Sequence, residues 1–149
     1  MPTPIERVLL DTNVLVYAMN RDSEHHDSCR NLLERAADGE VSACLAQQIL
    51  FEYFAVVTSA RQMPKPLSVA EAASDVERLS DLFPILQPTA GVVSLALSLA
   101  RTLGVVGRRI FDLVLAATML ENGVTAIYTY DDHFANMPGV VPLRPGAAP

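Results

Sequence analysis

Apolar and polar residues follow a repeating pattern along the chain, in which a short apolar run precedes a longer amphipathic segment. The short runs predict strands at residues 5–10, 41–44, 85–86, 125–130 and 140–141. The longer segments predict helices at residues 11–19, 23–37, 47–60, 68–82, 91–103 and 111–121. Strands that alternate with helices predict an α/β sandwich with a mainly parallel sheet. Since no repeat or linker divides the chain, we expect one domain over residues 1–149.

The predicted helix ends carry recognisable signals. Ser23 is the expected N-cap of the second helix, which should end near Gly39. Ser68 with Glu71 three residues later predicts a capping box at the start of the fourth helix. The helix at 47–60 is apolar almost all round, so we expect it to be buried.

Acidic residues stand alone in several of these apolar segments. Glu52 and Asp112 each interrupt an otherwise hydrophobic helix, and Asp11 follows the first strand directly. Asp131 and Asp132 follow the strand at 125–130. An isolated carboxylate in an apolar setting costs several kcal/mol unless it is compensated. Each acid also has an ordinary explanation, as a helix cap, an ion-pair partner of an arginine or a turn former.

The joint pattern of these acids favours a shared site. Asp11 and Asp131 lie at the carboxyl ends of predicted parallel strands, where ligand crevices form, and Glu52 and Asp112 lie on helices that pack on the sheet. Converging carboxylates repel each other unless they are protonated or bind a cation. Because the ligands are hard oxygen atoms, Mg²⁺ or Mn²⁺ is the expected ion, and such sites are suited to the hydrolysis of phosphodiesters.

Four segments resemble the motifs of PIN-domain ribonucleases, in particular the VapC-like toxins of prokaryotic toxin–antitoxin pairs. The segments are LLDTNVLVYA at 9–18, QILFEYF at 48–54, FDLVLAA at 111–117 and TYDDHF at 129–134, which matches a T-x-D-x-x-F ending. The resemblance covers residues 9–142. It implies a PIN-like α/β/α sandwich with a short central sheet flanked by helices.

The resemblance also implies an activity and partners. It indicates a Mg²⁺-dependent endoribonuclease in which Asp11, Glu52, Asp112 and Asp131 form the catalytic and metal-binding site, with Mn²⁺ as a substitute ion. Asp132 is the alternative for the fourth acid. The expected partners are an RNA substrate, a small VapB-like antitoxin whose basic tail covers the acidic pocket, and a second copy in a homodimer.

Several neighbouring residues are candidates for supporting roles. Thr12, Asn13 and Thr129 flank the acids and could orient a carboxylate or a water. Arg108 and Arg109 are candidate phosphate contacts just before Asp112, and His133 lies beside the predicted pocket.

One other group of metal-ligand residue types occurs near the N-terminus. His25 and His26 precede Cys29 by four and three residues, a spacing that also occurs in zinc sites. Because no second ligand pair is present, we expect these histidines to be solvated instead. Cys29 and Cys44 are expected to serve as small buried hydrophobes.

Composition narrows the function classes. The chain has 149 residues, of which 50 % are hydrophobic, and a net charge of −6 from 11 basic and 17 acidic residues. This acidity argues against a general nucleic-acid-coating protein, although a metal ion reverses the charge that a phosphate meets locally. We expect a cytoplasmic protein without a membrane span.

Other functions are compatible with the same sequence. The alternatives are a housekeeping RNA-processing PIN nuclease without an antitoxin and a PIN-like module that binds RNA or protein without cleavage. A phosphoacceptor signalling domain also gathers aspartates at strand ends. However, such a domain would need a lysine near the end of the chain, whereas Lys65 lies in a proline-flanked loop.

Overall fold

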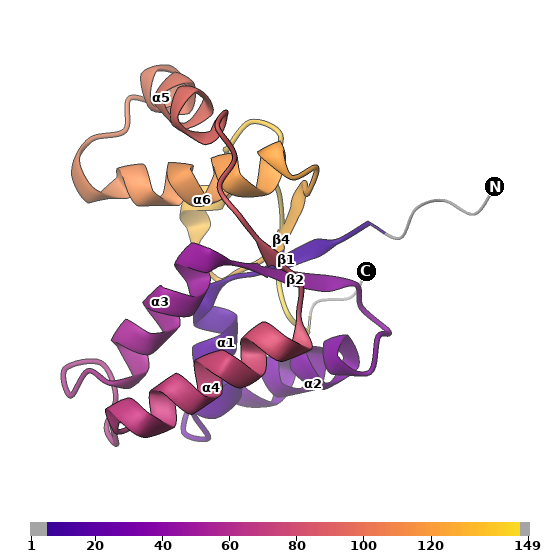
Figure 1. The fold of residues 1–149 in the computed structure, drawn as a ribbon, viewed down its shortest axis with the longest axis vertical. Coiled ribbons are helices and arrows are strands. Elements are labelled where there is room, and N and C mark those ends of the chain that lie inside the picture. Colours follow the sequence, from indigo (N-terminus) through magenta and orange to yellow (C-terminus); the bar gives the residue numbers. More distant parts are fainter. Residues whose placement is uncertain (1–5, 147–149) are drawn as a thin grey trace.

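Five parallel strands form one central sheet with helices on both faces (Figure 1). The computed structural model describes residues 6–146. The strands are β1 (Val8–Leu10), β2 (Ala43–Ala46), β3 (Ile85–Leu86), β4 (Ala126–Tyr128) and β5 (Val141–Leu143), in the order β3-β2-β1-β4-β5. Every pairing between neighbouring strands is parallel. The expected α/β/α sandwich with a parallel sheet is confirmed.

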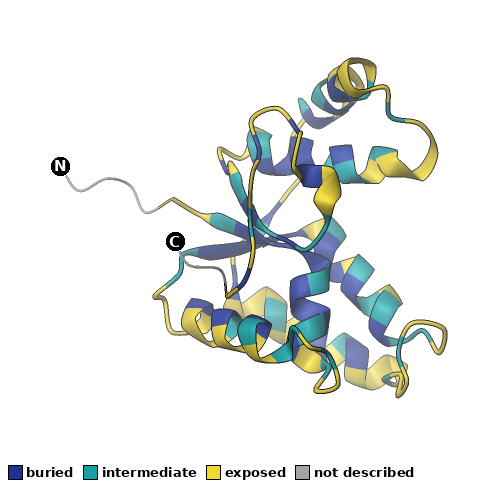
Figure 2. Cartoon of the chain, turned by 180° about the vertical axis from the view of Figure 1, so that it is seen from behind, coloured by how far each residue is buried: buried dark blue, intermediate teal, exposed yellow. Residues whose placement is uncertain are grey.

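The helices divide between the two faces of the sheet. They are α1 (Thr12–Met19), α2 (His26–Ala37), α3 (Gln47–Val57), α4 (Val69–Leu82), α5 (Val92–Leu103) and α6 (Ile110–Glu121). Figure 1 shows α5 and α6 on one side of the strands and α1 to α4 on the other. Figure 2 shows that buried residues follow the strands and the helix faces turned toward them. The predicted capping box at Ser68 and Glu71 is present at the start of α4.

The central strand β1 positions the site. Leu9 and Leu10 are completely buried, because β1 is covered on both faces and paired on both sides. The β1–β4 pairing continues one step beyond the strand, where the Asp11 N–H donates to the Tyr128 carbonyl over 3.0 Å. The carboxyl ends of β1 and β4 therefore lie side by side at one edge of the sheet.

Four elements differ from the sequence-based expectations. β2 lies at Ala43–Ala46, two residues later than the range 41–44, because Leu45 and Ala46 are needed to pair with β3. α2 begins at His26 and not at Ser23. The Ser23 hydroxyl oxygen accepts the N–H of His25 over 3.1 Å, so Ser23 closes a turn that precedes the helix.

The third difference concerns α3. This helix ends at Val57, since Thr58 caps it and donates its hydroxyl to the Phe54 carbonyl over 2.7 Å. The expectation that the helix is buried all round is wrong. Ile49 and Tyr53 are buried, but Phe51 is 67 % exposed on the opposite side.

β1 begins at Val8, three residues later than the predicted range 5–10. The remaining boundaries agree to within about two residues. The 3-10 turn Gly107–Arg109 before α6 was not predicted. Pro142 lies in β5, an edge strand, which tolerates the missing N–H of proline. Ile5, placed in the first predicted strand, lies outside the described residues. Within residues 6–146, no helix is long and apolar enough to cross a membrane.

Candidate active site at the carboxyl edge of the sheet

A cavity of about 490 Å³ opens at the carboxyl edge of the sheet and is lined by four carboxylates. Asp11 comes from the junction of β1 and α1, Glu52 from α3, Asp112 from α6 and Asp131 from the loop after β4. The structure thus brings together the four acids that the sequence indicated. Apolar side chains, among them Leu115 and Phe134, complete the wall.

Asp11 is the most enclosed of the four acids, with an exposed fraction of 6 %. One carboxylate oxygen, Oδ1, accepts the backbone N–H of Thr12 over 2.7 Å, so Asp11 also caps α1. The other, Oδ2, accepts the Thr129 hydroxyl over 2.6 Å and the Asn13 side-chain amide over 3.2 Å. The side chains of Asn13 and Thr129 therefore have the geometry to orient this carboxylate, whereas the Thr12 side chain donates to Glu52.

Burial raises the pKa of Asp11 from its ordinary value of 3.8 to about 6. The hydrogen bonds from Thr129 and Thr12 oppose this rise, and the negative charges of Glu52 and Asp131 add to it. The folded chain therefore holds a carboxylate whose negative charge is poorly compensated by other protein groups. A cation placed in the cavity would relieve that cost.

Glu52 is held at both carboxylate oxygens by neutral donors. Thr12 donates its hydroxyl to Oε2 over 2.8 Å, and Gln48 donates its side-chain amide to Oε1 over 2.7 Å. The same Gln48 nitrogen also donates to the Phe111 carbonyl over 3.0 Å, which links α3 to the start of α6. Sequence reasoning gave Gln48 no role, although it lies four residues before Glu52 on the same helix face.

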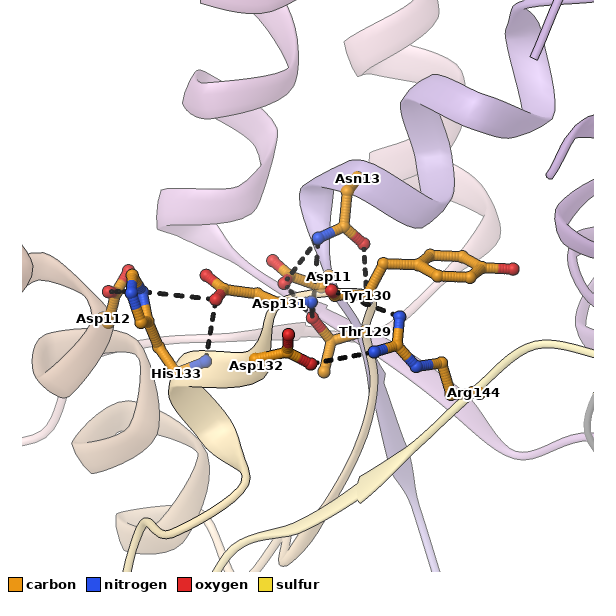
Figure 3. A network of polar contacts seen from close by, with 9 residues as sticks. All are labelled: Asp11, Asn13, Asp112, Thr129, Tyr130, Asp131, Asp132, His133 and Arg144. Carbon is orange, nitrogen blue, oxygen red and sulfur yellow. Dashed lines mark hydrogen bonds and ion pairs between the residues drawn. The ribbon is translucent and has the colours of Figure 1, made fainter. Parts of the chain in front are cut away.

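His133 contacts both Asp112 and Asp131 (Figure 3). The His133 Nδ1 atom is 3.2 Å from Asp112 Oδ2 and 3.2 Å from Asp131 Oδ1. Burial and the neighbouring Asp131 raise the pKa of Asp112, whereas His133 and Arg109 lower it. The sequence placed His133 beside the pocket without indicating this contact with two acids.

The two consecutive aspartates have different surroundings. Asp131 lines the cavity, and its backbone N–H donates to Thr129 Oγ1 over 2.9 Å. Asp132 is 89 % exposed at its side chain and forms an ion pair with Arg144 over 2.9 Å. The structure therefore places Asp131 with the other acids and directs Asp132 toward Arg144 (Figure 3).

The two candidate phosphate contacts lie at the outside of the site. Arg108 and Arg109 belong to the exposed 3-10 turn before α6 and are not among the residues that line the cavity. Arg109 is close enough to Asp112 to lower the pKa of that carboxyl. The turn is thus a source of positive charge near the acids.

Beside the acidic cavity, a cluster of rings anchors the loop after β4. The rings of His25 and Tyr130 are stacked with centroids 4.1 Å apart, and Tyr17 meets Tyr130 edge to face at 5.4 Å. His26 Nδ1 lies 3.0 Å from the Tyr17 carbonyl, so the expectation of two solvated histidines is wrong. Cys29 is fully buried and contacts the Tyr130 hydroxyl, and Cys44 is also buried, as expected of small hydrophobes.

The donor set of the cavity fits a hard divalent cation. Four carboxylates converge without an arginine or lysine among the lining residues. Within the described residues, oxygen and nitrogen atoms of Asp112, Asp131 and His133 lie within 4.8 Å of one another, close enough to share one ion. Carboxylate oxygens are preferred ligands of Mg²⁺ and Mn²⁺.

Comparisons with known proteins agree with this geometry. A family model described as "PIN domain" matches residues 8–140. The chain is 31 % identical over 122 residues to Ribonuclease VapC24 of Mycobacterium tuberculosis, covering 80 % of this chain and 83 % of that protein. It is 30 % identical over 142 residues to Ribonuclease VapC7 of the same species, covering 95 % and 93 %.

Solved structures support the fold. The crystal structure of VapBC2 from Rickettsia felis, bound to a DNA fragment from their promoter, matches with a TM-score of 0.67 and 20 % identity over 93 % of this chain and 98 % of that chain. Mycobacterium tuberculosis VapC20, described as a sarcin–ricin loop cleaving toxin, also matches with a TM-score of 0.67 at 19 % identity, covering 93 % and 99 %. The chain belongs to the PIN-domain family and is related there to the VapC ribonucleases.

Proposed function

We propose that this protein is a divalent-metal-dependent endoribonuclease and the toxin of a VapBC-type toxin–antitoxin pair. The observation that carries the proposal is the convergence of Asp11, Glu52, Asp112 and Asp131, from four separate elements, on one cavity. The relatives named Ribonuclease VapC, at about 30 % identity over most of the chain, support RNA as the substrate.

The residues that hold the metal in this proposal are the four acids, and Mg²⁺ is the expected ion, with Mn²⁺ as a substitute. When bound, a divalent cation lowers the pKa of a water, orients the phosphate and offsets the negative charge of the transition state. The raised pKa of Asp11 supports this assignment, because a carboxylate that is costly to ionise alone is stabilised by a nearby cation.

The surrounding residues fix the orientation of the acids. Thr129 and Asn13 hold Asp11 Oδ2, while Thr12 and Gln48 hold the two oxygens of Glu52. These donors limit the rotation of the carboxylates, which reduces the reorganisation needed when substrate binds. Arg108 and Arg109 are proposed to contact phosphates of the RNA as it approaches from the side of α6.

The proposed partners follow from the same site. Structures of VapBC and related toxin–antitoxin complexes are among the chains with this fold. An acidic cavity attracts arginine side chains, which pair bidentately with carboxylates. We therefore propose that a small antitoxin covers the cavity with a basic tail that becomes ordered on binding, and that the toxin forms a homodimer.

Cleavage of a labelled RNA by the purified chain tests the nuclease proposal. We expect strand scission in Mg²⁺ or Mn²⁺, loss of scission in EDTA, recovery when Mg²⁺ is restored, and poor support by Ca²⁺ because its looser geometry misplaces the reacting groups. Asp112→Asn, which keeps the side-chain shape and removes the charge, should be inactive. Undiminished cleavage in EDTA after exhaustive dialysis would contradict the proposed metal dependence.

Expression in cells tests the antitoxin proposal separately. We expect the chain alone to stop growth, and its co-expression with the product of a short adjacent reading frame to restore growth and yield a co-purifying complex. If the chain is harmless at high expression and no small partner co-purifies, the toxin assignment fails while the nuclease assignment stands.

A further inference from the structure

His133 lies close to two of the four acids of the site. Its Nδ1 atom is equidistant, at 3.2 Å, from carboxylate oxygens of Asp112 and Asp131. A single Nδ1–H shared between two acceptors makes a weaker, bifurcated bond to each of them. The same Nδ1 atom, when it carries no proton, is a metal ligand, and it lies within 4.8 Å of a ligand oxygen of both acids.

Two of the three distances within this group match the spacing of neighbouring ligands around one ion. Ligand atoms in neighbouring positions of a six-coordinate site with bonds of about 2.1 Å lie about 3 Å apart. The two 3.2 Å separations at His133 are close to this value, and all three ligand atoms lie within 4.8 Å of one another. An ion could therefore be accommodated here with small side-chain shifts.

We propose that His133 is a nitrogen ligand of the metal, which joins Asp112 and Asp131 in a mixed nitrogen–oxygen site and gives Mn²⁺ an advantage over Mg²⁺. This inference rests on the proposed function, since it concerns the ion that the nuclease uses. It adds a ligand that the four-carboxylate description lacks and assigns that ligand an effect on metal choice.

The backbone holds His133 in place for this role. The His133 N–H donates to Asp131 Oδ1 over 2.9 Å, which makes Asp131 the cap of the turn Asp132–Phe134. Phe134, the next residue, is fully buried and fixes the end of this turn in the core. The imidazole thus projects from a short, anchored turn, while 47 % of its side chain stays accessible to an entering ion.

The chemistry of imidazole sets the expected preference. Mg²⁺ favours oxygen ligands and gives up its water molecules reluctantly, whereas first-row transition ions bind imidazole nitrogen more readily. A site built only of carboxylates would discriminate little between Mg²⁺ and Mn²⁺. Replacing one oxygen by the His133 nitrogen should favour Mn²⁺.

Pulsed electron paramagnetic resonance of the full chain loaded with Mn²⁺, after removal of any polyhistidine tag, tests the proposal. We expect electron spin echo modulation from a directly bound ¹⁴N nucleus, and its loss in His133→Ala. The chain has three histidines. The double variant His25→Ala/His26→Ala therefore leaves His133 alone and should retain the signal. Calorimetric titration should show that His133→Ala weakens Mn²⁺ binding by about tenfold or more, which is the size of effect seen when residues around a metal site are replaced. The same variant should weaken Mg²⁺ binding by much less.

The outcomes separate this inference from the proposed function. One possible outcome is that Mn²⁺ binds to the wild-type chain and not to Asp112→Asn, but that the bound ion shows no nitrogen modulation. In that case His133 is not a ligand, although the carboxylate site stands. Equal losses of Mn²⁺ and Mg²⁺ affinity in His133→Ala would also overturn the proposed selectivity. If the wild-type chain binds neither ion and cleaves no RNA, both the inference and the proposed function fail.

Discussion

Thr129 donates its hydroxyl to Asp11 Oδ2 over 2.6 Å and thereby joins the loop after β4 to the end of β1. The Thr129 hydroxyl oxygen, Oγ1, in turn accepts the backbone N–H of Asp131 over 2.9 Å. One buried hydroxyl thus fixes two of the four acids relative to each other. This bond forms because the parallel pairing of β1 with β4 brings the two strand ends together.

Replacing Thr129 by valine removes this hydroxyl while keeping the shape of the side chain. Asp11 then loses a donor that lowers its pKa, and the Asp131 N–H loses its acceptor. We expect the free energy of unfolding to fall by about 1–3 kcal/mol, the range for a buried hydrogen bond to a charged group, and RNA cleavage to fall about tenfold or more. Urea unfolding and a cleavage assay measure these two effects.

Thr125→Val is the matched control for this variant. Thr125 is an exposed residue just before the same strand, and its side chain lies outside the cavity. Its substitution should change the free energy of unfolding by no more than about 0.5 kcal/mol and should leave the cleavage rate close to that of the wild type. If both valine variants behave alike, the bond from Thr129 to Asp11 has no special role in the site.

Asp11 should make the stability of the metal-free protein depend on pH. Because its pKa is raised from 3.8 to about 6, the folded chain binds the proton more tightly than the unfolded chain. The contribution of this group to the free energy of unfolding is therefore unfavourable above pH 6 and disappears below pH 4. The shift corresponds to a cost of about 3 kcal/mol at neutral pH.

Asp11→Asn removes this titration. The stability of Asp11→Asn relative to the wild type should therefore rise by up to about 3 kcal/mol between pH 4 and pH 7.5 in EDTA, although the variant should be inactive as a nuclease. Urea unfolding followed by circular dichroism at several pH values measures the difference. A stability difference that is constant across this range would show that Asp11 is not held as a costly buried carboxylate.

Gln48 should act by positioning Glu52. In Gln48→Ala, Glu52 Oε1 loses its donor and α3 loses its bond to the Phe111 carbonyl. We expect kcat to fall about tenfold with a smaller change in KM, since the acid is misdirected and not removed. The neighbouring Gln47→Ala, at an exposed position, is the control and should retain full activity. Equal kcat values for the two variants would show that Gln48 does not position Glu52 for catalysis.

Much of this architecture could be predicted because strong local patterns determine it. The strand before Asp11 is a continuous apolar run, and Ser68 with Glu71 gives a capping box that the structure contains. The order of the strands in the sheet could not be predicted in this way, because it depends on contacts between distant segments. The misplacement of β2 has the same cause, since its range is set by pairing with β3 and not by its own side chains.

The site shows the same division between local and distant information. The four acids are recognisable because charges are rare in apolar segments, so each is conspicuous in the sequence. Gln48 has no such signal, since a polar residue near the start of a helix is common, and its role follows from its contacts with Glu52 and the Phe111 carbonyl in the structure. The resemblance to a T-x-D-x-x-F ending favours Asp131 over Asp132, and the structure adds that Asp131 lines the cavity whereas Asp132 pairs with Arg144.

The neighbours Asp131 and Asp132 allow a sharp test of whether the cluster of carboxylates at the end of the sheet is responsible for RNA cleavage. The measurement is the single-turnover rate of RNA cleavage in Mg²⁺ by Asp131→Asn and Asp132→Asn, two adjacent variants with the same change of charge. We expect Asp131→Asn to lose activity by at least about a hundredfold, as happens when a group that stabilises the transition state is removed. Asp132→Asn, which loses only an exposed ion pair with Arg144, should cleave at the wild-type rate. Equal rates for the two variants, or a greater loss in Asp132→Asn, would show that the acids lining the cavity are not the catalytic group.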